Sequence, residues 1–96
     1  MTDRLTHPMI RTAEQTCEAC PDQWEGELHD GRAFYFRYRF GRATLAVGPD
    51  HRSVAGVCSP DQPGVRSVLI GHHLAGVFKD DQERETVFGQ LIEMHG

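Results

Sequence analysis

Apolar and polar side chains alternate along residues 23–47, and the rest of the chain is organised around this stretch. An aromatic or aliphatic side chain at every second position is typical of a β-strand. Asp30-Gly31 is a strong signal for a type I′ hairpin turn, and Gly41 marks a second turn. The pattern therefore predicts three antiparallel strands, at residues 23–29, 32–40 and 42–47.

The two faces of the middle strand differ, because successive side chains on a strand point to opposite sides of the sheet. One set is entirely aromatic and is expected to point into the core: Phe34, Phe36, Tyr38 and Phe40. The other set is mostly cationic and is expected to point away from the core: Tyr35, Arg37 and Arg39. The first set predicts a packing surface, and the second predicts an accessible one.

Two further elements follow toward the C-terminus. The apolar run at residues 65–70 favours a strand, although its spacing also fits a helix that reaches residue 72. Asp80, with Glu83 three residues later, is a capping pair that predicts a helix start. Gly89 within this helix is expected where helix and sheet approach closely. The helix has an apolar stripe that should dock on the sheet: Val87, Phe88, Leu91 and Ile92.

The domain organisation is simple, since 96 residues support one thin core. Residues 1–16 show no sustained period and contain Pro8. We therefore expect residues 1–20 to form an irregular N-terminal arm, with a helical turn at residues 12–16 left open. Residues 21–96 are expected to form a single domain of the α+β class, an antiparallel meander of four or five strands with one C-terminal helix packed on one face.

The composition is that of an ordinary soluble globular protein, with 39% hydrophobic and 25% charged residues. No apolar run approaches the roughly 18–20 residues of a membrane span, so no membrane association is expected. The N-terminus lacks the apolar core of a secretion signal, which makes the cytoplasm the expected compartment.

The net charge of −4 hides a segregated distribution. Residues 14–31 carry six acids and no Lys or Arg, whereas residues 32–52 carry five Arg and one acid. This balance argues against general binding to the nucleic-acid backbone, but it leaves room for a local cationic patch on one strand pair.

The cationic stretch holds the residues that we expect to bind an anion. Arg37 and Arg39 are two apart on one strand, so their guanidinium groups should leave the sheet on the same side, roughly 7 Å apart at the backbone. Forked Arg donors bind phosphate and carboxylate, and the Tyr35 ring would offer a stacking surface for a base. The competing interpretation is that Glu25 and Glu27 neutralise the arginines in cross-strand pairs. The predicted ligand-binding residues are Tyr35, Arg37, Arg39 and Arg42.

Three cysteines, an odd number, argue against a disulfide framework and leave thiols or a metal site. The Cys-x-x-Cys spacing before the first predicted strand supplies half of a tetrahedral zinc site, and ordinary thiols or redox chemistry are the alternatives. His7, His51 and His73 are other possible fourth ligands. The zinc set that we name consists of Cys17, Cys20, Cys58 and His72.

The chain has no complete catalytic motif. It lacks a Gly-rich phosphate loop, a Gly-x-Ser-x-Gly elbow and a His-x-x-x-His pair. We therefore expect a protein that is not an enzyme and that needs no cofactor apart from the zinc considered above. A small enzyme is kept as a further alternative.

Residues 23–41 resemble small uncharacterised accessory proteins encoded by phages of actinobacteria. The resemblance is carried by Gln23-Trp24-Glu25-Gly26, by Asp30-Gly31-Arg32 and by Phe34-Tyr35-Phe36-Arg37-Tyr38-Arg39-Phe40-Gly41. It implies an accessory protein of the kind that binds and disables a host component, and it implies no particular site residues.

The sequence thus predicts a non-catalytic binding protein. Its partner would be a small anionic, nucleotide-like ligand or an acidic surface of a host protein. The alternative is a zinc-stabilised protein–protein interaction module. A homo-oligomer is also expected, because a sheet face that carries Tyr35 beside arginines suits an interface.

Overall fold

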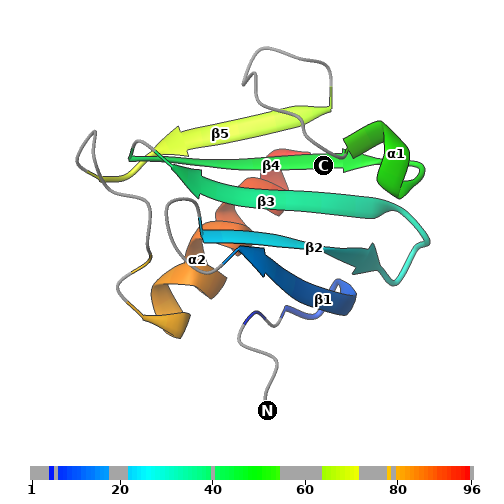
Figure 1. Cartoon of the computed structure of the whole chain (residues 1–96), viewed down its shortest axis with the longest axis horizontal. Coiled ribbons are helices and arrows are strands. Elements are labelled where there is room, and N and C mark those ends of the chain that lie inside the picture. Colours follow the sequence, from blue (N-terminus) through cyan, green and yellow to red (C-terminus); the bar gives the residue numbers. More distant parts are fainter. Residues whose placement is uncertain are drawn as a thin grey trace.

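The structure is a computed structural model that describes residues 5, 7–17, 22–39, 41–54, 64–71, 78 and 80–95. These residues form five strands and two helices (Figure 1). In chain order they are β1 (Ile10–Cys17), β2 (Asp22–Leu28), β3 (Ala33–Arg39), β4 (Arg42–Gly48), α1 (His51–Val54), β5 (Val65–Leu69) and α2 (Asp81–Met94).

The strands form one open antiparallel sheet in the order β1-β2-β3-β4-β5, so neighbours in sequence are neighbours in space. Helix α2 crosses one face of this sheet (Figure 1). The predicted α+β meander with a C-terminal helix is confirmed, and residues 65–69 form a strand rather than a helix. The turn after β2 contains Gly31 at φ 92° and the turn after β3 contains Gly41 at φ 75°, as tight turns require.

The prediction of an irregular arm is wrong for residues 10–17, which form the edge strand β1, and so is the helical turn at residues 12–16. The strand is held to β2 by antiparallel pairing, with register shifts between Ile10 and Thr12 and between Gln15 and Cys17. These two irregularities interrupt the period-two alternation, so the strand is hard to recognise from the pattern of side chains. Leu5, which precedes β1 in the expected arm, is 1% exposed and belongs to the core.

The main core lies between α2 and the sheet. Phe88 of α2 meets Phe34 and Phe36 of β3 edge-on, with ring centroids 5.3 Å apart in both pairs. The predicted inward direction of Phe34, Phe36 and Tyr38 is confirmed, and Phe40 lies outside the described residues. The buried members also include Trp24, Leu28, Ala43, Leu45, Phe78, Val87, Leu91 and Ile92.

A buried ion pair joins α2 to β2, and no sequence pattern predicts it. Asp22 is 0% exposed and Arg84 is 1% exposed. Arg84 donates to Oδ2 of Asp22 from Nη2 at 2.9 Å and from Nε at 3.3 Å. Oδ1 of Asp22 accepts from Trp24 Nε1 at 2.9 Å and from Gln15 Nε2 at 3.0 Å. Both carboxylate oxygens are therefore hydrogen-bonded, which a charge buried in this way requires.

Two glycines differ in how closely the rest of the chain packs against them. A Cβ on Gly26 would collide with the backbone oxygen of Thr12, so β1 can approach β2 this closely only where β2 has no side chain. A Cβ on Gly89 would meet the His7 ring at 3.6 Å, an ordinary contact. The prediction that Gly89 lies where helix and sheet approach closely is wrong, because Gly89 faces the N-terminal segment while Phe88 faces the sheet.

Candidate functional site

The face of the sheet opposite α2, here called the outer face, carries the predicted arginines. The register pairs Arg37 with Thr44 and Arg39 with Arg42. Side chains of paired residues lie on the same face, so the structure brings these arginines together across β3 and β4. We call Arg37, Arg39 and Arg42 the arginine strip.

The geometry of the strip follows from the strand spacing. Arg37 and Arg39 are roughly 7 Å apart along β3, and the paired Cα atoms of Arg39 and Arg42 are about 4.5–5.5 Å apart. Arg39 and Arg42 are exposed and Arg37 is half-buried. Nη1 of Arg42 donates to Oγ of Ser67 on β5 at 3.0 Å, which orients one guanidinium along the sheet. Like charges directly opposite each other destabilise a sheet by about 0.2–1 kcal/mol.

Tyr35 is not the open stacking surface that the sequence predicts. Its exposed fraction is 6%, and it belongs to a second, smaller core on the outer face. Residues 51–54 form α1, in a segment rich in turn-forming residues, and α1 places Val54 in this core. The Tyr35 hydroxyl donates to Oε1 of Gln23 at 2.8 Å. Its ring is therefore unavailable to a nucleotide base. The members of the smaller core are Ala33, Tyr35, Ala46, Val54 and Val65.

The acids of the outer face lie beside the strip, on β1 and β2. Glu27 forms an ion pair with Arg11 across the β1–β2 pairing. Glu25 is paired with Tyr35 on one side and with Glu14 on the other. Within the ranges that the structure describes, the carboxylates of Glu14 and Glu25 form no ion pair. The outer face thus has an acidic half on β1 and β2 and a basic half on β3 and β4.

The predicted zinc set falls mostly outside the described residues. Cys20, Cys58 and His72 are not described, and Cys17 is a half-buried thiol at the end of β1. Among the described residues, no group of three or more His, Cys, Asp or Glu could hold a metal ion. The zinc-stabilised module therefore stays a prediction.

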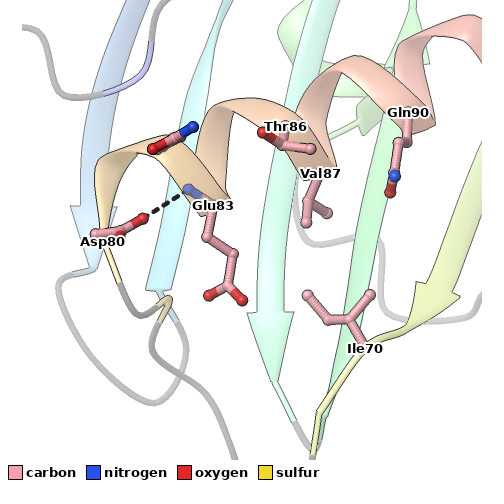
Figure 2. A pocket seen from close by; sticks show the side chains of 7 residues that line it. Ile70, Asp80, Glu83, Thr86, Val87 and Gln90 are labelled. Carbon is pink, nitrogen blue, oxygen red and sulfur yellow. Dashed lines mark hydrogen bonds between the residues drawn. The ribbon is translucent and has the colours of Figure 1, made fainter.

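A groove of about 450 Å³ lies beside the start of α2, on the side of the sheet away from the strip. Figure 2 shows the Glu83 side chain reaching from the helix toward Ile70, while Asp80 caps the helix. Asp80 Oδ1 accepts from the Glu83 backbone N–H at 2.8 Å. With two acids and no cation in its lining, this groove does not suit an anion. It is lined by Ile70, Asp80, Gln82, Glu83, Thr86, Val87 and Gln90.

No family model, curated protein or solved structure matches the chain. In the described part of the chain, no helix is both long and apolar enough to cross a membrane.

Proposed function

We propose that the chain is a small, non-catalytic binding protein whose arginine strip binds an acidic surface of another protein. The observation that carries this proposal is the direct pairing of Arg39 with Arg42. The pairing places two guanidinium groups side by side on one face, where both can bind carboxylates of a partner.

The shape of the site favours a protein over a nucleotide as the partner. A nucleotide site needs a concave pocket and a flat ring on which the base stacks. The Tyr35 ring is buried, and Arg39 and Arg42 of the strip are exposed on the outer face of the sheet. Forked guanidinium groups spread over such a face suit carboxylates that are themselves spread over a surface.

The resemblance of residues 23–41 to accessory proteins of actinobacterial phages supports the same proposal. Proteins of that kind often bind and disable a component of the host. An acidic surface of a host protein is then the natural partner for the strip.

A titration with a glutamate-rich peptide tests the proposal. We expect the backbone amide resonances of β3 and β4 near the strip to shift saturably, with an affinity that falls as the salt concentration rises. Shifts confined to other parts of the chain, or binding that does not respond to salt, would contradict it.

The arrangement of charges on the outer face also favours a second copy of this chain as the partner. Glu14 and Glu25 form a like-charge pair in the acidic half, as Arg39 and Arg42 do in the basic half. In a two-fold dimer the same face is used twice, so each acidic pair could meet the partner's arginine pair. This arrangement would account for the predicted homo-oligomer.

Charge reversal distinguishes the dimer from a foreign partner. The variant Glu14→Arg/Glu25→Arg and the variant Arg39→Glu/Arg42→Glu should each be monomeric, because like charges would face each other. An equimolar mixture of the two should form a heterodimer by light scattering. Wild-type protein with a mass near 10.8 kDa at high concentration would exclude the dimer and leave the foreign partner.

A further inference from the structure

A second cavity, with a volume of about 680 Å³, lies at the opposite end of α2 from the groove in Figure 2. Three parts of the chain surround it: residues 7–9, the turn between β2 and β3, and the last turn of α2. Its volume falls in the range of about 300–1,000 Å³ that is usual for small-molecule sites. It contains no member of the arginine strip. The lining consists of His7, Met9, Arg32, Ile92, Glu93 and His95.

One side of the cavity is suited to an anion. Asp30 holds Arg32 in place, accepting from the Arg32 backbone N–H at 3.0 Å and from Nε at 2.8 Å. These bonds lower the pKa of the Asp30 carboxyl below its usual value. Within the described residues, the Nη groups of Arg32 donate to no other side chain. The guanidinium is thus oriented while its terminal donors stay available for a carboxylate.

Another side is suited to a cation. Glu93 lies in the last turn of α2, where the helix dipole is negative and no basic residue is present. His95 Nε2 lies 2.9 Å from the Leu45 carbonyl oxygen, which can only accept, so this nitrogen carries the proton. Burial lowers the pKa of His95, which keeps the ring neutral and leaves Nδ1 as an acceptor. Glu93 and His95 therefore offer acceptors for an ammonium group.

The cavity also has an apolar part. Met9 and Ile92 contribute aliphatic side chains to its lining. The His7 ring is held beside them, since its Nδ1 accepts from the Met9 backbone N–H at 3.1 Å and the ring packs on Phe88 with centroids 5.5 Å apart. A ligand that fills this cavity would combine both charges with a small apolar group.

We propose that this cavity binds a small zwitterion of the α-amino-acid class. The carboxylate would bind Arg32, the ammonium group would bind Glu93 and His95, and an aliphatic side chain would contact Met9 and Ile92. The proposal does not depend on the function of the arginine strip.

The test compares three probes by NMR titration of labelled protein. L-Leucine carries both charges, N-acetyl-L-leucine lacks the ammonium group, and L-leucinamide lacks the carboxylate. We expect saturable shifts around the cavity with leucine, and affinities at least about tenfold weaker with either analogue, because each loses a charge-assisted contact. Equal affinities for the three probes, or no saturable shift with leucine, would overturn the proposal.

Two variants test which residue binds each charged group of leucine. In Arg32→Gln, leucine should bind no better than leucinamide, and in Glu93→Gln it should bind no better than N-acetyl-leucine. Arg52→Gln and Asp50→Asn remove the same charges elsewhere on the exposed surface and should bind leucine as the wild type does. Loss of leucine binding in these two controls as well would show that net charge, not the cavity, governs binding. An arginine-strip variant should retain leucine binding, which separates this proposal from the first.

Discussion

Replacement of Arg84 by Met tests the buried ion pair, the least expected feature of the fold. The two side chains have similar volumes, so the change removes a charge and the hydrogen bonds donated to Asp22 and Asp81 without opening a large cavity. Asp22 would keep its bonds from Trp24 and Gln15 but would lose its buried counter-charge. The contacts of the Arg84 guanidinium with the Trp24 and Phe78 rings, at 5.2 and 5.6 Å from the centroids, would also be lost.

The expected loss of stability in Arg84→Met is large relative to the total free energy of unfolding. Removing one partner of a buried pair costs about 3–5 kcal/mol, because the other charge is left uncompensated. A domain of this size has a free energy of unfolding of roughly 5–14 kcal/mol. The melting temperature should therefore fall by roughly 10–40 °C. Asp22→Asn should cost less than Arg84→Met, because Arg84 retains its ion pair with Asp81.

Urea denaturation of both single variants and of the double variant Asp22→Asn/Arg84→Met measures these losses. The double variant should lose less than the sum of the singles, by about 1–3 kcal/mol, because no uncompensated charge remains. Arg11→Met is the matched control, since its ion pair with Glu27 is exposed and should contribute about 0–1 kcal/mol. If each single variant lost no more stability than Arg11→Met, or if the losses in stability of the two single variants simply added in the double variant, the buried ion pair would not stabilise the fold as described.

Three further substitutions test the packing around two glycines and the effect of His95 protonation on stability. Gly26→Ala should lower the free energy of unfolding by more than about 2 kcal/mol in urea and should expose β1 amides to hydrogen exchange, because the added Cβ would collide with the Thr12 carbonyl. Gly89→Ala should raise the free energy of unfolding by about 0.5–1 kcal/mol, because the methyl group makes only ordinary contact with His7 and alanine favours the helix. Burial lowers the pKa of His95 in the folded state, so the unfolded chain takes up the proton first. Stability should therefore decline as the pH falls below the ordinary value of 6.5, and His95→Gln should weaken that decline in urea denaturation at a series of pH values.

The central hairpins could be predicted because local signals agree there. The alternation of β3 and the turn glycines Gly31 and Gly41 fix the strand direction and the face of each side chain. The N-cap of α2 is likewise local, since Asp80 accepts from the backbone of Glu83 only three residues away.

The features that could not be predicted depend on contacts distant in sequence. Strand β1 has few apolar residues and two register shifts, and its pairing with β2 identifies it. The pairing of Asp22 with Arg84 spans 62 residues, and nothing in the helix pattern distinguishes Arg84 from an exposed residue.

The candidate site was predicted in part. The placement of Arg37, Arg39 and Arg42 on one face follows from strand periodicity and a two-residue turn, and the register confirms it. The burial of Tyr35 could not be foreseen, because it depends on α1, a four-residue helix in a segment with turn composition.

The most direct test of the proposed function is the affinity of Arg37→Ala/Arg39→Ala for a glutamate-rich peptide. The matched control is Arg11→Ala/Arg52→Ala, which makes the same change in net charge at exposed positions outside the strip. The strip variant should fold with a stability within about 1 kcal/mol of wild type and should bind at least about tenfold more weakly, while the control should bind nearly as wild type does. Undiminished binding by the folded strip variant, or an equal loss in the control, would contradict the proposal that the arginine strip binds an acidic partner.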